Sequence, residues 1–238
     1  MSAKLQIVEV VTATDAEDMA TFFKTIWTDG DEVVPFDLVL AVVHIGGYAT
    51  IAKQDNKVVG ASFGFLGEYA AHRVLHSHVT AASVPGVGFQ LKQHQFAWAQ
   101  EREIAGITWT FDPLVRRNCV FNFEKLGALA VEYLPNFYGT MTDAINAGDD
   151  SDRLFAYWPV QESLSNETTK TSAIALKNNA GAPASQGFDN TKAFWVELPE
   201  DIEAMRKSDL ELARQWRKAV REVLQPALDD GCFISAVN

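Results

Sequence analysis

Apolar, mostly β-branched residues dominate the first segment of the chain, and a helical pattern follows it. Residues 5–11, LQIVEVV, have the composition and spacing of a β-strand. The apolar residues that follow recur at helical spacing as far as Ile26, with Thr14 or Asp15 as the N-cap. A second helical pattern covers residues 36–45. The N-terminal part of the chain is therefore predicted to contain one strand and two helices.

Strand patterns dominate the next segment. Residues 47–67 contain two β-rich runs, and the pair Asp55 and Asn56 between them is typical of a tight hairpin turn. Such a hairpin among alternating strands and helices predicts a mixed α/β sheet. After it we expect a strand over 73–81, a helix over 87–103, a buried strand over 105–111, a helix over 114–126 that ends at Gly127, and strands over 128–135 and 152–160.

The composition changes after residue 160. Residues 161–190 are rich in Ser, Thr, Asn, Gly and Ala and poor in large apolar side chains, which predicts a long exposed excursion or linker. We then expect a strand over 192–199, a helix with a capping box of Ser208 and Glu211 that Pro226 ends, and a last strand over 232–237. The predicted organisation is one domain over 1–160, the polar excursion over 161–190, and a strand-helix-strand extension over 191–238 packed on the same domain.

The overall composition is that of a soluble globular protein. The chain has 238 residues, of which 47% are apolar and 21% charged, enough to bury a large core. Its net charge of −11 argues against nucleic acid as a partner, because no block of Lys and Arg occurs. An anionic ligand would therefore have to be held locally, by backbone amides and a few placed cations.

Cysteine usage and hydropathy indicate the compartment. Cys119 and Cys232 are the only cysteines, too few to staple a domain of this size, so we expect buried thiols in a reducing environment. The first residues lack the pattern of a secretion signal, and no run of eighteen uncharged apolar residues occurs. We expect a cytoplasmic protein with no membrane segment.

One glycine-containing stretch carries most of the candidate chemistry. In HVTAASVPGVGFQLK, a strand runs into Gly86, Val87 and Gly88 and then directly into a helix. The first amide groups of a helix lack intrahelical acceptors, so such a turn suits a pyrophosphate. A tight strand-to-helix turn without any ligand is the alternative. A P-loop and a dinucleotide fold do not fit, because the required Lys-Ser or Lys-Thr pair and the third glycine are missing.

The order of elements resembles the GNAT superfamily of acyl-CoA-dependent N-acyltransferases. The stretches LHSHV, LKQHQFAWAQ, WTFDPL, NCVFNFEKLGA, YLPNFYG and SDRL are similar, more narrowly, to a little-characterised GNAT-like family, and the resemblance runs from Val42 to Trp158. It implies an α/β fold with a GNAT-like mixed, mostly antiparallel central sheet flanked by helices. It also implies acetyl-CoA or another acyl-CoA as the cofactor.

The resemblance assigns cofactor contacts to the glycine turn and to the strands beside it. Gly86 and Gly88 match the glycines of the GNAT loop, although Ser83 stands where Arg or Gln is expected. The amides of Gly86, Val87, Gly88 and Phe89 would surround the coenzyme A pyrophosphate. GNAT strands splay beside this helix, so the pantetheine arm would pair with the freed edge that includes Val79 and Thr80.

The helix over 114–126 matches the element that usually supplies an Asn and a Tyr. These positions hold Arg116 and Phe123, so Asn118 and Asn122 are the candidates for the polar contacts. The cations available for the nucleotide 3′-phosphate are Lys92, Arg116, Arg117 and Lys125, of which we expect one or two to be used and the others to be solvated.

Amine acylation also needs a group that removes a proton from the amine. His76 and His78 alternate along one strand and share a face, and His78 is the candidate base, with a hydrogen-bonded structural histidine as the alternative. Glu68 is a remote candidate that would act through water.

Three further residues are candidates for proton or substrate contacts. Asp112 would orient an ammonium substrate, or would instead cap the helix that opens at Pro113. Tyr138 or Tyr133 would replace the missing acid, or would belong to a packed aromatic turn.

These observations favour an enzyme that moves an acyl group, acetyl or a larger one such as succinyl, from coenzyme A to a small-molecule amine by direct attack. No arrangement for a covalent intermediate and no metal-ligand spacing is apparent. The alternatives are a GNAT-like module that binds coenzyme A without turnover and a structural subunit that binds none. A homodimer is one candidate assembly.

Overall fold

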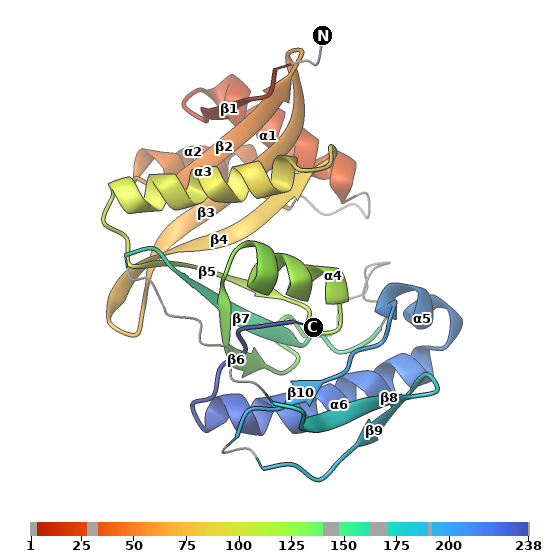
Figure 1. Cartoon of the computed structure of the whole chain (residues 1–238). Helices are drawn as coiled ribbons and strands as arrows, with labels where there is room; N and C mark the ends of the chain where they lie inside the picture. Colours follow the sequence, from red (N-terminus) through yellow and green to blue (C-terminus); the bar gives the residue numbers. More distant parts are fainter. Residues whose placement is uncertain (1–3, 28–32, 140–147, 162–170, 190–191, 238) are drawn as a thin grey trace. The chain divides into compact units, whose positions relative to one another are not determined.

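The computed structural model describes residues 4–27, 33–139, 148–161, 171–189 and 192–237 (Figure 1). The chain divides into two compact units, and we describe each by itself. The first unit comprises Met1–Trp109 with Pro159–Ser163, and the second comprises Thr110–Trp158 with Leu164–Asn238. The domain boundaries expected near residues 160 and 190 stay a prediction.

The first unit contains a mostly antiparallel sheet. Its strands follow the order β1-β2-β3-β4-β5, and only β4 and β5 are parallel. The turn between β2 and β3 has positive φ at both Asp55 (49°) and Asn56 (61°), which confirms the predicted hairpin. The strands are β1 (Gln6–Glu9), β2 (Tyr48–Gln54), β3 (Lys57–Tyr69), β4 (His72–Ala82) and β5 (Gly106–Phe111), the last of which crosses into the second unit.

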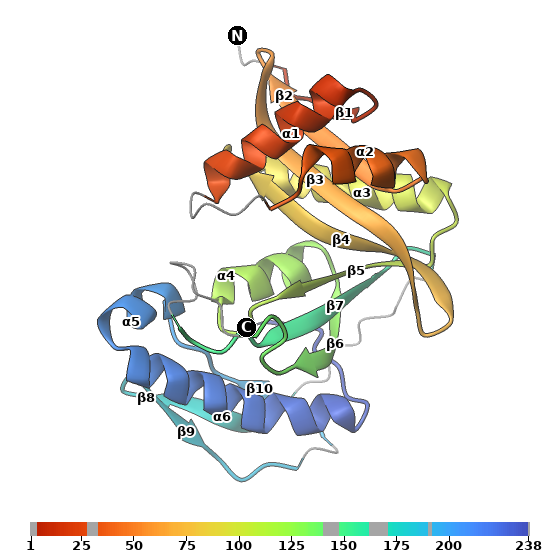
Figure 2. The same ribbon diagram turned by 180° about the vertical axis from the view of Figure 1, so that it is seen from behind.

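Helices cover both faces of this sheet. Figures 1 and 2 show α1 (Ala13–Ile26) and α2 (Phe36–His44) on one face and α3 (Val87–Glu101) on the other. The α1 and α2 face buries a core that includes Met19, Phe23, Val39, Ile51 and Phe63. A smaller core of Ala52, Val87 and Leu91 lies under α3.

The N-cap of α1 differs from the expectation. Thr12 caps the helix, and its hydroxyl accepts the amide of Asp15 at 3.1 Å while the Asp15 carboxylate accepts the amide of Thr12 at 3.3 Å. This reciprocal capping box satisfies two amides, which Thr14 or Asp15 as the cap would not achieve.

The second unit combines a strand pair, a three-stranded sheet and helices. β6 (Leu129–Leu134) pairs antiparallel with β7 (Arg153–Pro159). A separate sheet has the order β10-β8-β9, from β8 (Ile174–Asn179), β9 (Ala182–Ser185) and β10 (Trp195–Val196). The helices are α4 (Arg116–Cys119), the π-helical turn η1 (Val120–Lys125), α5 (Ile202–Ser208) and α6 (Leu210–Asp229), and α6 contacts β6, β8 and β9.

The helix expected over 114–126 is shorter and partly π-helical. It begins at Arg116, and the amide of Leu126 donates to the carbonyl of Phe121 at 3.1 Å, a π-type hydrogen bond. Gly127 follows with φ +71°, which agrees with its predicted role as the helix stop.

The C-terminal region differs most from the sequence prediction. The hairpin of β8 and β9 lies within the expected exposed excursion, and Ala175 and Leu176 are fully buried. Asp209, not Ser208, caps α6 by accepting the amide of Leu212 at 3.0 Å, while the Ser208 hydroxyl donates to the carbonyl of Ala204.

The predicted end of the last helix and the final strand are also corrected. Pro226 lies inside α6, which continues to Asp229 because Ala227 and Leu228 are buried. The expected strand over 232–237 is reduced to one antiparallel bridge between Ile234 and Ala130.

Candidate functional site

The glycine turn before α3 is open. Gly86 is the N-cap of α3 with φ +84°, a conformation that is strained for L-residues, so glycine is required there. A Cβ atom built on Gly86 would have no atom within 4 Å, and one on Gly88 would meet only the Cβ of Ala82 at 4.0 Å. The backbone of this turn is therefore accessible to a bulky ligand.

The first amides of α3 are available as donors. The amide of Val87 donates to the carbonyl of Val84 at 3.3 Å, and no side chain caps the helix. Within the described residues, the amides of Gly88 and Phe89 make no hydrogen bond. Free donors and the positive end of a helix dipole together favour an anion.

β4 has an unpaired edge next to this turn. β4 and β5 pair only where Val74, Leu75 and His76 face Gly106, Ile107 and Thr108. In the described part of the first unit, residues 77–82 of β4 pair with β3 alone. Backbone groups along this edge are thus free to bind an extended ligand as an added strand would.

A β-bulge interrupts β4 at the beginning of this edge. The register changes from Val79 opposite Phe63 to Ser77 opposite Gly64, so His78 is the extra residue. Gly64 is necessary, because a Cβ there would lie 2.7 Å from the carbonyl oxygen of His76. Bulges of this kind re-aim side chains and locally end strand pairing.

Both strand histidines contact Phe65, which confirms that they share a face. The ring centre of Phe65 lies 5.2 Å from that of His76 and 5.8 Å from that of His78. His76 Nδ1 lies 3.1 Å from the Thr108 hydroxyl, and burial, with His78 and Lys92 nearby, lowers the pKa of His76 to about 4. Partial burial also lowers the pKa of His78, whose ring is nevertheless exposed to solvent. At neutral pH, His78 is therefore uncharged and able to accept a proton.

Lys92 lies in the interior. Its side chain points from α3 to β4, where Nζ donates to Ser77 Oγ at 2.8 Å and to Gln95 Oε1 at 3.3 Å. Nζ also lies 4.1 Å from the ring centre of Trp109. Burial lowers the pKa of Lys92 to about 7. A phosphate contact by Lys92 stays a prediction, and it would require these bonds to break.

In the second unit, the carboxylate of Asp112 already has hydrogen-bond and ion-pair partners within the protein. Its carboxylate accepts the amide of Leu114 at 2.9 Å, as the capping alternative predicts, and binds Arg206 at 2.6 Å and Arg217 at 2.7 Å. Burial alone would raise the pKa of Asp112, but the two guanidinium groups hold it well below its usual range. An ammonium substrate would have to compete with two arginines.

The tyrosine candidates differ in their surroundings. The Tyr138 hydroxyl lies 3.0 Å from that of Thr110, and its ring is exposed. The Tyr133 hydroxyl is buried and donates to Asp152 at 2.6 Å, so burial and this carboxylate raise its pKa. Tyr138 is thus the more accessible of the two.

The predicted residues fall into both units. Among the helix candidates, Asn122 is buried, Asn118 is half-buried and Lys125 is exposed, while Arg117 pairs with Glu203. His78, Val79, Thr80, Gly86, Val87, Gly88, Phe89 and Lys92 belong to the first unit, and Asp112, Asn118, Asn122, Lys125 and Tyr138 belong to the second.

Two features escaped the sequence analysis. The bulge at His78 depends on pairing with β3, and its one local signal is Gly64 within an otherwise apolar strand. The buried arginines on α5 and α6 had no signal, because their spacing suits a solvated helix face.

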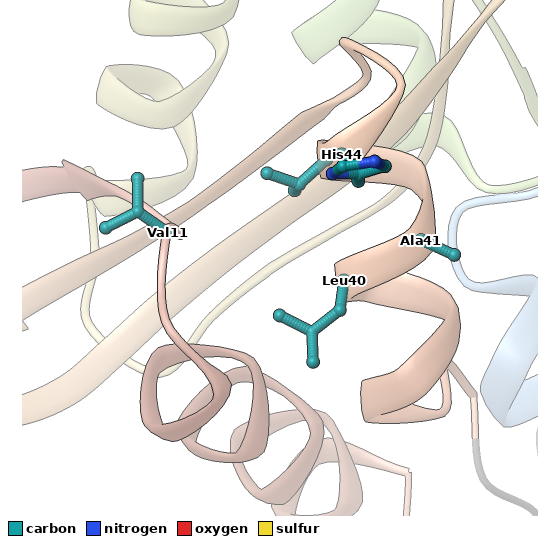
Figure 3. A pocket seen from close by; sticks show the side chains of 5 residues that line it. Val11, Leu40, Ala41 and His44 are labelled. Carbon is teal, nitrogen blue, oxygen red and sulfur yellow. The ribbon is translucent and has the colours of Figure 1, made fainter.

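The first unit also contains an open hollow of about 560 Å³. Figure 3 shows Leu40, Ala41 and His44 on α2 and Val11 on the segment before α1 around it, and Val43 completes the lining. None of these lining residues was predicted to act.

The described residues contain neither a metal-binding cluster nor a membrane-spanning helix. No group of three or more His, Cys, Asp or Glu side chains in the described ranges is arranged to hold a metal ion. Of the helices the structure describes, none combines the length and apolar character needed to cross a membrane.

Comparison with known proteins identifies the fold. No family model and no curated protein sequence matches the chain. An acetyltransferase of the GNAT family from Streptococcus pneumoniae matches the structure with a TM-score of 0.52 at 14% identity, over 66% of this chain and 99% of that one. The chain has the GNAT fold.

Two further proteins match this GNAT fold. An aminoglycoside 6′-acetyltransferase of type Ii has a TM-score of 0.52 at 17% identity, over 67% of this chain and 99% of its own. A NatC complex bound to a Gag peptide and CoA has a TM-score of 0.51 at 11% identity, over 66% of this chain and 98% of that one. The predicted fold class is confirmed.

Proposed function

We propose that the protein is an N-acyltransferase that moves an acyl group from coenzyme A to the amine of a small molecule. The observation that carries this proposal is the combination of an open glycine turn with free amides at Gly88 and Phe89 and an unpaired β4 edge beside it. The GNAT fold supports it, because acetyltransferases share that fold.

The residues present fit an acyl-CoA. The amides of Gly88 and Phe89 would hold the diphosphate, and the unpaired β4 edge that includes Val79 and Thr80 would bind the amide-containing arm. The open space at Gly86 leaves room for both. Bound coenzyme A would supply the activated acyl group as a thioester.

His78 would prepare the amine. An ammonium is not a nucleophile, and a neutral imidazole within reach removes its extra proton. The lowered pKa of His78 keeps the ring neutral at pH 7, and its exposure makes it accessible to an acceptor from solvent. Direct attack of the amine on the thioester then needs no covalent intermediate.

The proposal also specifies the class of acceptor and the acyl group. Among proteins of this fold, one is named for an aminoglycoside and another binds a peptide, so the fold alone selects neither. We propose a small amine, and acetyl or a larger group such as succinyl. Two cysteines in a chain of this size fit a reducing, cytoplasmic setting, and a homodimer stays a prediction.

Coenzyme A binding is the first test. At about a hundred times Kd, a ligand stabilises the folded state by about 2.7 kcal/mol, which a thermal shift detects. Gly88→Glu places a carboxylate among the free amides without a steric clash, and Gly86→Pro forbids φ +84°. Both should weaken binding at least about tenfold, that is by about 1.4 kcal/mol. Normal binding by both variants would exclude this cradle.

Gly67→Glu is the matched control. It adds the same charge on β3 of the same unit, and a Cβ there meets no atom within 4 Å. Binding by this variant should equal that of the wild type. Release of free thiol from acetyl-CoA with a panel of amines then tests turnover.

A second candidate function is a GNAT-like module that binds coenzyme A without turnover. Phe123, at the position where the family has a Tyr, is buried against Phe111 with ring centres 5.9 Å apart and has no hydroxyl. Ser83, at the Arg or Gln position, donates to the carbonyl of Val59 at 3.2 Å. Tight binding with no thiol release from any amine would favour this module.

A further inference from the structure

A buried lysine without a carboxylate partner lies between α3 and β4. The Lys92 side chain is 6% exposed, and within the described residues no acid lies in hydrogen-bond or ion-pair contact with Nζ. Lysines are almost never buried unless they are paired. The position therefore calls for an explanation.

The surroundings of Nζ suit both protonation states of the amine. An ammonium has three donors, and Ser77 Oγ, Gln95 Oε1 and the Trp109 ring provide three acceptors at 2.8, 3.3 and 4.1 Å. A neutral amine keeps two of these contacts, and its lone pair accepts the Ser77 hydroxyl once that hydroxyl rotates. Loss of a proton thus leaves no polar group without a partner.

Neighbouring side chains hold this arrangement in place. Gln95 Nε2 donates to Ser62 Oγ at 3.4 Å, and Ser62 Oγ lies 2.7 Å from Thr80 Oγ1. Gln95 therefore presents its oxygen, not its amide nitrogen, to Lys92. The cluster is oriented from β3, β4 and α3 together.

The cluster reaches the unpaired edge of β4. His76 is the last β4 residue that faces β5, so Ser77 is the first residue of the free edge, directly before the bulge at His78. Under the proposed function, the thioester arm lies along this edge. Ser77 is then the hydroxyl closest in the chain to the reacting end.

We propose that Lys92, acting through the hydroxyl of Ser77, supplies the proton that the leaving thiolate takes up. This inference rests on the proposed function and supplies an acid from within the first unit, since Phe123 has no hydroxyl, Tyr133 is bound to Asp152, and the accessible Tyr138 belongs to the second unit. Because Lys92 acts through Ser77, it is a positioning residue and not a group that contacts the reacting atoms. The new N–C bond forms as the C–S bond breaks, and the sulfur takes the Ser77 proton while Ser77 takes one from Lys92. Of the two protons that the acceptor ammonium loses, one restores Lys92 and one enters solvent.

The energetics match this task. A pKa of about 7 lets Lys92 exchange its proton near neutral pH, below the value of about 8.5 typical of a thiol. The titratable group that interacts electrostatically with Lys92 is His76 on β4, whose pKa the Lys92 charge helps to lower. The other contacts, from α3, β4 and β5, are the uncharged Gln95, Ser77 and Trp109.

The test is the pH dependence of thiol release from acetyl-CoA. A proton donor must be charged, so the wild-type rate should fall as pH rises through about 7. Lys92→Met and Ser77→Ala should lower kcat about 10²-fold to 10⁴-fold and remove this descending limb. Lys92→Arg keeps a charge and controls for folding, and its profile should also lack the descending limb. Lys57→Met, at an exposed position of the same unit, should retain the wild-type profile.

A second readout uses the protein without cofactor. The ¹⁵Nζ resonance of Lys92, assigned by its loss in Lys92→Met, should titrate near 7, whereas an ordinary lysine titrates at about 10.4. Titration near 10, or an unchanged descending limb in Lys92→Met and Lys92→Arg, overturns the role of Lys92 and leaves the proposed acyltransferase function standing. Wild-type protein that binds coenzyme A but releases no thiol with any amine removes the proposed function and this role together.

Discussion

Replacing Asp112 with asparagine should strongly destabilise the second unit. Asp112 accepts three hydrogen bonds from Arg206 and Arg217, at 2.6, 2.7 and 2.9 Å. Asp149 accepts three further bonds from the same two guanidinium groups, and both arginine side chains are at most 2% exposed. In Asp112→Asn, two buried cations lose a carboxylate that they share, and the new amide group donates where only acceptors are useful.

The magnitude follows from the buried charges. Removing one partner of a buried ion pair costs about 3–5 kcal/mol, because the remaining charge stays desolvated. Summing the separate hydrogen bonds would exceed this value, since bonds within one network are not additive. For a chain of this size each kcal/mol shifts Tm by about 2–4 °C, so we expect a loss of about 6–20 °C.

The pH dependence has a definite sign. The pKa of Asp112 is depressed in the folded state, so its stabilisation is complete above the unfolded value of about 3.9 and is lost as the pH falls below it. Wild-type stability should therefore decline more steeply below about pH 4 than that of Asp112→Asn.

Urea unfolding followed by circular dichroism, repeated from neutral to acidic pH, measures both effects. Glu203→Gln is the control, because it breaks an exposed ion pair with Arg117 and should cost less than about 1 kcal/mol. If Asp112→Asn also loses less than about 1 kcal/mol at pH 7, the cluster does not stabilise the fold as argued.

Three other substitutions or reactions test local features. Gly64→Ala places a Cβ 2.7 Å from the carbonyl oxygen of His76 and should cost about 1–3 kcal/mol in thermal unfolding; an unchanged Tm would mean that the bulge is easily deformed. Burial raises the pKa of the Cys119 thiol to about 12, so a thiol reagent at about pH 8 should modify the partly exposed Cys232 and spare Cys119 until urea is added, as peptide mass spectrometry would show. Asp209→Ala removes the cap of α6 and should cost about 1 kcal/mol in urea unfolding; equal stability would place the cap elsewhere.

The parts of the fold that were predicted correctly depend on local chemistry. The turn at Asp55 and Asn56 and the glycine turn at Gly86 follow from which residues tolerate positive φ, and this preference is readable in a few letters. The hairpin over 174–185 depends on distant packing. Its buried residues, Ala175 and Leu176, lie in a sheet that α6 covers, and the short sequence around them gives no signal of that contact.

The helix boundaries show a different limit. Ser208 and Asp209 are both good N-cap residues, and only the backbone conformation decides between them. Pro226 disfavours a helix interior, yet burial of the two residues after it continues α6 for another turn. Tertiary packing outweighed local preference in this case.

Some features of the candidate site also follow from the sequence, whereas others depend on tertiary packing. The free amides at the start of α3 follow from sequence, because a glycine turn before a helix predicts them. The bulge at His78 is a property of strand register, which one strand alone does not encode. Burial of Lys92 needs Ser77 and Trp109 from two other elements, so the sequence suggested a cation available to a phosphate or to solvent.

The bulge also separates two chemical tasks along one strand. His78 contacts Phe63 and Phe65 on one face, where the ring is exposed, whereas Ser77 contacts Lys92 under α3 on the other face, where both are buried. An acceptor arriving from solvent would therefore meet a neutral imidazole, and the departing sulfur would meet a hydroxyl backed by an ammonium. Because the pKa of His78 is lowered by its own surroundings and that of Lys92 by separate burial, a neutral His78 and a protonated Lys92 can coexist at the same pH. That division requires a bell-shaped pH profile whose two limbs are removed by different substitutions, His78→Ala on the acidic side and Lys92→Met on the basic side.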